Sequence, residues 1–423
     1  MWKAARWCRI VPAGDSPLTT RPSAGSKSDS SRGGFAMTLF HQTQDFSIGR
    51  HSGRFVYNPT CSACLSGTPH KRHRKVAAPE TGGGAGVSPT AAPSTRGTSP
   101  ADVSARKIID VHHHLMPPRY YEEVGAQRIF GRSSRKASGP FTWTPQISID
   151  AMDRNGIATA ITSISAPGTW FASELDSRTI TRYCNDYAAQ LMADYPGRFG
   201  MFAALPLPDI DGSLREIEYA LDTLKADGFC LMSSYDNKWP GDETFKPVFD
   251  ELNRRKTIVF VHPTVSAACT NLISFVPEAV IEFPFDAVRA VVSLLYSGTL
   301  SRCSDVRFIF PHAGNAVPTL KARICRVVGN DKVLASRLPN GPLAELQKLY
   351  FDIALSARPE TLAPLMELVS IKNVLFGSDF PFANRGASLE ENLEGFYKYG
   401  FTDEQLRAVE SGNAELLLPN FGR

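Results

Sequence analysis

The chain has little of what marks disulfide-stapled and membrane-spanning proteins. It holds eight cysteines in 423 residues, and the five that follow residue 105 form no paired pattern, which favours a reducing compartment. No apolar run reaches the length of a transmembrane helix. We therefore expect a soluble, cytoplasmic protein without a membrane partner.

An excess of charge of one sign is also absent from most of the chain. The formal net charge is +4, but residues 1–105 carry 13 Lys/Arg against 5 Asp/Glu, whereas the remaining residues carry 33 against 37. The basic excess therefore belongs to the front segment. The rest of the chain has no excess of basic residues to attract nucleic acid, so we expect no nucleic-acid partner.

Residues 1–105 lack the apolar periodicity of a folded domain. Runs such as Thr81–Ser104 are rich in Gly, Pro, Ser and Thr, a composition that buries too little apolar surface to offset the entropy of ordering. We expect a disordered basic extension. Its first residues contain no acid before Asp15, which is compatible with a mitochondrial transit peptide and hence a mitochondrial location. The alternative is an extension that arises from a misplaced start codon.

Four residues of this extension superficially resemble a zinc site: Cys61, Cys64, His70 and His73. The spacing between the cysteine pair and the histidine pair is far shorter than in a zinc finger, and no helix or hairpin signal frames them. We interpret the group as a chance cluster.

From Arg106 onward, short apolar strands alternate with amphipathic helices, the pattern of repeated βα units. Eight strands are expected, at Lys107–Leu115, Thr159–Ile164, Arg198–Leu205, Gly228–Ser233, Thr257–Val261, Arg307–Phe310, Tyr350–Leu355 and Val374–Phe376. Helices are expected, among others, at Ile149–Asn155, Glu174–Tyr195, Leu214–Ala226, Thr244–Lys256, Asp286–Leu300, Leu389–Tyr397 and Asp403–Glu410. This order predicts an α/β fold, a (β/α)8 TIM barrel over residues 106–423.

Histidine is scarce too, and its placement is informative. Of nine histidines, five follow residue 105, and each lies at the end of an apolar run. His112 and His114 share one face of the first strand and His113 takes the other, because side chains alternate along a strand. His262 ends the fifth strand, and His312 follows the sixth. Active sites of TIM barrels lie at the carboxyl ends of the strands, so we expect these side chains to meet.

One carboxylate joins this set. Asp379 follows the eighth expected strand and would reach the same end of the barrel. Three neutral imidazoles and a carboxylate suit one divalent metal, best zinc and less well manganese. A further histidine beside the metal could move a proton near neutral pH. Spacing does not decide which histidine that is; His113 we assign to packing or to a hydrogen bond behind the site.

Four motifs carry a resemblance to a known family: Asp110–His114 (DVHHH), Phe260–Pro263 (FVHP), Pro311–Gly314 (PHAG) and Gly377–Pro381 (GSDFP). They are similar to those of the amidohydrolase superfamily, and more narrowly of its aminocarboxymuconate-semialdehyde decarboxylase-like branch. Within this branch the sequence looks closest to the 6-methylsalicylate decarboxylases. The resemblance covers about residues 106–420.

The resemblance implies roles for individual residues. It implies that His112, His114, His262 and Asp379 hold one metal, that His312 is the catalytic acid or base, and that Asp379 also belongs to the catalytic set. The fourth expected strand, GFCLMSS, has no lysine to be carboxylated, so a second metal is not expected.

Two residues near His312 also gain an interpretation. Arg323, eleven residues later, matches an arginine that in this branch reaches the substrate carboxylate of a neighbouring subunit, which implies a homodimer. The alternative is an ordinary solvated helix residue. Asn315 stands where the branch usually has glycine, which would alter the loop beside His312.

The function that the resemblance implies is a metal-dependent, oxygen-independent decarboxylase of a small aromatic or unsaturated carboxylic acid, for example 6-methylsalicylate giving 3-methylphenol. Trp143 and Trp170, with Phe171, would wall an aromatic pocket, or else belong to the core. The alternative function is a metal-dependent hydrolase of a lactone or related ester, because reaction type lies in loop geometry. A non-catalytic binding protein would have lost ligands, and none is missing.

Overall fold

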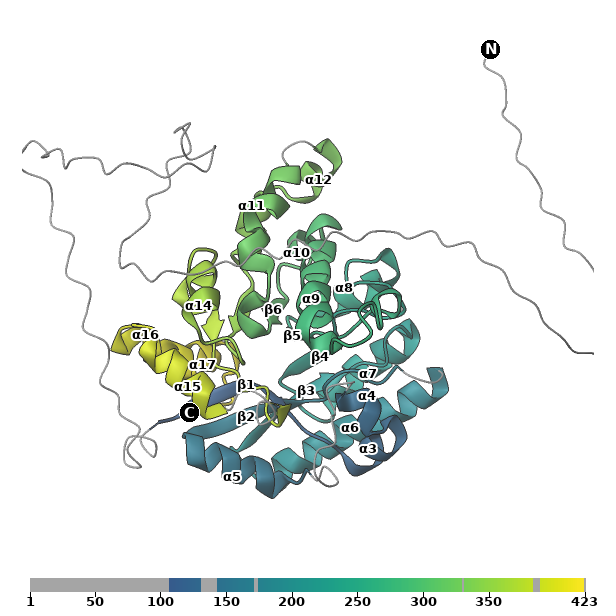
Figure 1. Cartoon of the computed structure of the whole chain (residues 1–423). Coiled ribbons are helices and arrows are strands. Elements are labelled where there is room, and N and C mark those ends of the chain that lie inside the picture. Colours follow the sequence, from purple (N-terminus) through teal and green to yellow (C-terminus); the bar gives the residue numbers. More distant parts are fainter. Residues whose placement is uncertain (1–105, 131–142, 171–173, 329–330, 383–388, 422–423) are drawn as a thin grey trace, which may run out of the picture. The chain divides into compact units, whose positions relative to one another are not determined.

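Eight parallel strands lie side by side in chain order in the computed structural model, which describes residues 106–130, 143–170, 174–328, 331–382 and 389–421 (Figure 1). The strands are β1 (Ile108–His114), β2 (Ile157–Ser163), β3 (Phe199–Ala204), β4 (Gly228–Met232), β5 (Ile258–His262), β6 (Arg307–Phe310), β7 (Tyr350–Asp352) and β8 (Val374–Leu375). β1, β3, β4 and β5 are buried along their whole length. Such strands are typical of a parallel sheet that helices cover.

Backbone hydrogen bonds between β1 and the segment that follows β8 close the sheet into a barrel. The N–H of Val111 donates to the carbonyl of Phe376 at 3.0 Å, and the N–H of His114 donates to that of Phe380 at 2.7 Å. The (β/α)8 barrel predicted from the alternation of strands and helices is therefore confirmed. All of its described residues belong to one compact unit, Gly86–Arg423.

Helices connect successive strands and surround the barrel (Figure 1). They are α3 (Pro118–Val124), α4 (Ala126–Phe130), α5 (Pro145–Asn155), α6 (Glu174–Asp194), α7 (Ile210–Asp222), α8 (Lys246–Arg254), α9 (Glu278–Tyr296), α10 (Thr299–Arg302), α11 (Val317–Val328), α12 (Lys332–Arg337), α13 (Pro342–Leu346), α14 (Pro359–Met366), α15 (Leu389–Lys398), α16 (Asp403–Arg407) and α17 (Asn413–Leu417). Their ends follow local chemistry. In α5 the Thr144 hydroxyl accepts from the N–H of Ile147, and Gly156 ends the helix at φ 72°.

Several helix starts differ from the sequence-based prediction. α5 begins at Pro145 rather than Ile149, and α8 begins at Lys246 rather than Thr244. α9 begins before Pro284 rather than after it. A proline inside a helix has no N–H to donate, so only one backbone hydrogen bond is lost, the one that the carbonyl of Val280 would accept. Val280 is 62% exposed, so water can satisfy that carbonyl. α7 begins at Ile210 rather than Leu214, because the Asp209 carboxylate caps it by accepting from the N–H of Gly212 at 3.0 Å.

The predicted helix Asp403–Glu410 is also divided. Its α-helical part, α16, ends at Arg407, and residues 408–412 continue as a π-helix, η7. In a π-helix each hydrogen bond spans five residues rather than the four of an α-helix. The periodicity of apolar residues in the sequence does not reveal this change.

The predictions for residues 1–105, including disorder and the dismissed Cys61, Cys64, His70 and His73 group, lie outside the described residues. Among the helices that the structure does describe, none combines the length and the apolar character needed to cross a bilayer. The cytoplasmic location, like the mitochondrial alternative, stays a prediction.

Candidate metal centre

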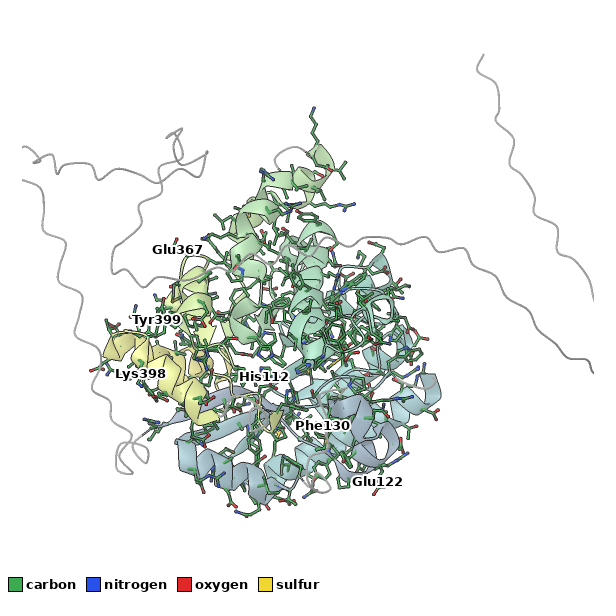
Figure 2. The ribbon with its side chains drawn as sticks, viewed as in Figure 1. His112, Glu122, Phe130, Glu367, Lys398 and Tyr399 are labelled. Atoms are coloured by element: carbon green, nitrogen blue, oxygen red, sulfur yellow. The ribbon has the colours of Figure 1, made fainter. Side chains whose placement is uncertain are left out.

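Four buried side chains converge where strands of the barrel end: His112 and His114 of β1, His262 of β5, and Asp379 just after β8. One potential ligand atom from each lies within 4.8 Å of the others. Figure 2 shows His112 toward the middle of the barrel. The four meet because β1 adjoins the segment after β8 and β5 lies across the ring, with all strands running the same way.

The atoms that lie closest together in the cluster are imidazole nitrogens and a carboxylate oxygen. His112 Nε2 lies 3.1 Å from His114 Nε2, and Asp379 Oδ1 lies 3.3 Å from the former and 3.1 Å from the latter. The His262 ring centroid is 4.8 Å from that of His114, and His262 Nδ1 is buried without a hydrogen-bond partner among the described residues. Converging imidazoles, one of which has an unsatisfied ring nitrogen, and a carboxylate fit a divalent cation.

The protonation states of the cluster also suit a cation. Burial lowers the pKa of His114, and burial together with the neighbouring imidazoles lowers that of His262 well below its usual range. Burial alone would raise the pKa of Asp379, but His112 and His114 hold it well below its ordinary value. At neutral pH these three side chains are therefore in the forms that bind metals: neutral imidazole and ionised carboxylate.

His112 behaves differently in the metal-free protein. Burial alone would lower its pKa, but the carboxylates of Asp352 and Asp379 overcome that effect and raise it to about 10. The protonated His112 thus supplies, between two carboxylates, the positive charge that a bound cation would otherwise supply. The cluster consequently attracts positive charge even before a metal is considered.

Second hydrogen bonds orient two of the imidazoles. His112 Nδ1 lies 3.0 Å from Asp352 Oδ2, and His114 Nδ1 lies 3.2 Å from the carbonyl of Ser163. Both contacts leave Nε2 for the centre. Sequence analysis missed Asp352; its signal was an acidic residue inside the apolar run YFDIAL of β7.

His312 lies beside the cluster rather than in it. Its ring centroid is 5.0 Å from that of His112. Its backbone N–H donates to Asp352 Oδ1 at 3.0 Å, and its Nδ1 lies 2.9 Å from the carbonyl of Ala354. Donation from Nδ1 leaves Nε2 as the nitrogen available for chemistry. His312 is only partly buried, unlike the four side chains of the cluster.

The turn that carries His312 is strained. His312 has φ 57°, Ala313 φ 54°, and Asn315 φ 54° with ψ −122°. A residue other than glycine in a sparsely populated region costs about 1–3 kcal/mol. Asn315 occupies a conformation that glycine adopts readily. The Asn315 side chain is tied back to the carbonyl of Pro311 at 3.2 Å.

His113 faces away from the cluster, as alternation along β1 predicts. Its Nδ1 lies 3.0 Å from Asp110 Oδ2 and its Nε2 lies 3.0 Å from Ser148 Oγ. Its ring stacks on that of Phe380 at 4.8 Å. The order Ser148–His113–Asp110 resembles a hydrolytic triad, but all three side chains are fully buried, so substrate has no access and the role is structural.

The expected aromatic and arginine residues do not join the cluster. Trp143 is buried, with its indole N–H donating to Ser148 Oγ at 3.0 Å. Trp170 donates instead to Asp236 Oδ2 at 2.9 Å. Arg323 is exposed on α11. Phe171 lies outside the described residues. The substrate-binding roles of Trp143, Trp170 and Arg323 therefore stay predictions.

Other aromatic rings do lie against the ligands. The Phe382 ring is 5.4 Å from that of His114, and Phe130 is 5.6 Å from Phe382. Phe260 packs against His112 at 4.9 Å. Sequence analysis missed Phe382, although it directly follows the Gly377–Pro381 motif. These rings exclude water from the ligands on the sides that they cover.

Known proteins resemble the chain over nearly the whole barrel. The amidohydrolase family model matches residues 109–419. The chain is 37% identical over 331 residues to the decarboxylase yanB of Aspergillus niger, covering 74% of this chain and 88% of that protein. It is 32% identical over 318 residues to a 6-methylsalicylic acid decarboxylase of Penicillium expansum, covering 74% and 96%.

Solved structures share the fold. The dihydroxybenzoic acid decarboxylase of Polaromonas, determined with bound manganese and the inhibitor 2-nitroresorcinol, superposes with a TM-score of 0.62 at 20% identity. The match covers 75% of this chain and 98% of that one. At this level of identity the likeness concerns the arrangement of the barrel.

The centre makes a prediction about metal and protons. Purified protein supplied with metal should hold about one divalent ion per chain, as one set of four ligands dictates. Because His112 in the metal-free protein has a pKa of about 10, it carries a proton at about pH 8, which the cation must displace. Binding should thus release about one proton, and apparent affinity should rise with pH.

Calorimetry in two buffers of different ionisation enthalpy measures this release. Equal heats in both buffers, or two tightly held ions per chain by elemental analysis, would contradict the assignment of His112 as a ligand in a single-metal centre.

Proposed function

The chain belongs to the amidohydrolase family, in its decarboxylase branch, and from this premise we propose that it removes the carboxyl group of a small aromatic acid in a metal-dependent, oxygen-independent reaction. It is thus a carboxy-lyase. The observation that carries the proposal is the pairing of a four-ligand cluster with a separate histidine, His312, whose ring lies 5.0 Å from a ligand ring. We assign this chemistry to residues 106–423.

The proposed substrate is 6-methylsalicylate, which would give 3-methylphenol and carbon dioxide. Support comes from the Penicillium expansum relative, whose name states that acid, at 32% identity. The carboxylate and the ortho hydroxyl of 6-methylsalicylate would offer two neighbouring oxygens to a bound cation. Other 2-hydroxybenzoates share this pair of groups, and they form the set of related substrates to compare.

We assign His112, His114, His262 and Asp379 as the ligands of one divalent cation, zinc foremost and manganese second. The borderline softness of imidazole with one carboxylate favours zinc, whereas the Polaromonas decarboxylase was determined with manganese. When bound, such a cation stabilises negative charge on substrate oxygens. Asp379 thereby also serves catalysis.

His312 is the proposed proton donor. A proton on Nε2 passes to the ring carbon that bears the carboxylate, and the ring loses its aromaticity. The bond between this carbon and the carboxylate then breaks, its electron pair returns to the ring, and carbon dioxide leaves. The hydrogen bond from Nδ1 to the carbonyl of Ala354 orients the ring and leaves Nε2 as the nitrogen that transfers the proton.

The lactone or ester hydrolase that the same ligands would allow has no support among these comparisons, because the relatives named above are decarboxylases. Neither oxygen nor an organic cofactor is required for the proposed reaction.

We further propose a homodimer in which Arg323 serves the site of the partner subunit. Arg323 is exposed on α11, as expected for a residue that acts outside its own chain. Large apolar side chains are also exposed before and within the first turns of α9: Leu272, Phe275 and Val280 are 62%, 86% and 62% exposed. An apolar surface of this kind is typical of a subunit contact.

The first prediction from this proposal concerns the reaction. Incubation of the metal-loaded enzyme with 6-methylsalicylate, without oxygen, should release one carbon dioxide per 3-methylphenol formed. A panel of hydroxybenzoates and aryl lactones, followed by chromatography and carbon dioxide detection, ranks the substrates. Hydrolysis of a lactone without any carbon dioxide release from the acids would overturn the proposal.

The second prediction separates ligand from proton donor. His262→Ala should lose both metal and activity. His312→Ala should keep the metal yet lose on the order of a hundredfold to ten-thousandfold in kcat, the usual contribution of general acid–base catalysis. Metal content and kcat are measured on the same samples. Loss of metal in His312→Ala would make His312 a ligand, and a nearly wild-type rate would remove it from the chemistry.

The third prediction tests the dimer by complementation. Arg323→Ala and His262→Ala should each be nearly inactive, but a mixed dimer holds one complete site. An equal random mixture should therefore recover about a quarter of wild-type activity, because half of the dimers are mixed and each has one working site of two.

Light scattering should give the mass of two chains. Arg326→Ala, which removes another exposed arginine of α11, is the matched control and should stay active. A mixture without recovered activity would show that Arg323 acts within its own subunit or has no role.

A further inference from the structure

One fully buried carboxylate touches both halves of the proposed chemistry. Asp352 lies at the end of β7, and its two oxygens accept three hydrogen bonds. Oδ2 faces Nδ1 of His112 at 3.0 Å. Oδ1 accepts from the backbone N–H of His312 at 3.0 Å and from that of Ala354 at 2.9 Å. The first contact concerns a proposed ligand, and the second concerns the turn of the proposed proton donor.

We propose that Asp352 is a positioning residue that sets His112 and His312 relative to each other through the two oxygens of a single carboxylate. The inference rests on the proposed function, in which His112 holds the cation and His312 moves the proton. It goes beyond that function by naming the group that couples the two.

On the His112 side, the contact determines which ring nitrogen carries the hydrogen. A carboxylate oxygen can only accept, so His112 Nδ1 must donate to Oδ2. The lone pair of a neutral imidazole then lies on Nε2, the atom 3.1 Å from His114 Nε2 and 3.3 Å from Asp379 Oδ1. Asp352 thus selects the form of His112 that can bind a cation at the centre.

On the His312 side, the contact holds a strained backbone. His312 has φ 57°, a conformation that persists only where its surroundings fix it. Two groups at the end of β7 fix it: Asp352 Oδ1, which accepts the backbone N–H, and the carbonyl of Ala354, which faces Nδ1 at 2.9 Å. The direction of His312 Nε2 therefore depends on the place of Asp352.

The segment after β8 leaves room for Asp352 and His112, because it carries a glycine at position 377. A Cβ atom on Gly377 would lie 2.8 Å from Asp352 Cγ and 2.9 Å from both Asp352 Oδ1 and His112 Cβ. Such distances force a shift of fully buried atoms. Gly377→Ala would therefore displace the carboxylate without removing its charge or its acceptors.

Asparagine at position 352 separates the two contacts, because an amide has one oxygen where the carboxylate has two. Two backbone N–H groups meet Oδ1, and only one ring nitrogen meets Oδ2, so the amide oxygen should face the backbone. The amide NH2 then faces His112 Nδ1, which must give up its hydrogen to Nε2. His112 in that form binds a cation at the centre poorly.

The experiment measures cation affinity and kcat separately. Asp352→Asn should weaken zinc binding by about 10–100-fold, in competition with a chromophoric chelator, with kcat at saturating metal close to that of the wild type. Asp352→Ala should lose the same affinity and, at saturating metal, also on the order of tenfold or more in kcat, because His312 is misplaced. Gly377→Ala keeps every group and should lower both quantities.

Glu216→Gln is the matched control, because Glu216 is also a buried carboxylate with several hydrogen bonds, to Arg182 and Asn185, but contacts none of the four ligands. Wild-type zinc affinity and kcat in all position-352 and position-377 variants, with only a lowered Tm as in the control, would overturn the inference. Normal kcat at saturating metal in Asp352→Ala would overturn the coupling to His312. If Asp352→Ala does not fold, Asp352→Asn and Gly377→Ala decide. Absence of zinc binding by the wild type would instead defeat the proposed function.

Discussion

The site depends on the burial of four ionisable side chains against one another. His112, His114, His262 and Asp379 are at most 8% exposed, so water cannot supply the hydrogen bonds that each would have in solution. The protein must supply them, through carboxylates, backbone carbonyls and the ligands themselves. A parallel barrel makes this arrangement attainable, because all strand ends that carry polar side chains open at one rim, above a core of apolar residues.

The positions of the site residues could be predicted from the sequence where the backbone geometry of strands and barrel determines them. Alternation along β1 predicts that His112 and His114 share a face, and a parallel barrel brings the ends of β5 and β8 to them. Asp352 could not be found in this way, because its partner His112 lies 240 residues earlier and no histidine accompanies it. Trp143 shows the converse, since an aromatic residue that walls a pocket and one buried in the core have the same sequence signal.

Backbone strain concentrates around the site. Of the ten non-glycine residues with positive φ in the described part of the chain, five lie in the turns after β6, β7 and β8, and they are His312, Ala313, Asn315, Leu355 and Asp379. Each costs free energy that packing must offset. Fixed turns would keep the proposed proton donor and the proposed ligands at a constant separation, and a displacement of about 1 Å can cost a hundredfold in rate.

β1 is the element on which this fixation centres. The Asp110 carboxylate accepts from the backbone N–H of His112 at 3.1 Å and of Ser378 at 3.0 Å, so it ties the backbone of His112, a proposed ligand, to the turn that bears Asp379. Asp352 ties the imidazole of the same ligand to β7. Backbone and ring of His112 are thus held by two different carboxylates. The conformational entropy of His112 is therefore lost during folding, and a cation bound by the proposed ligand set would not have to order this side chain.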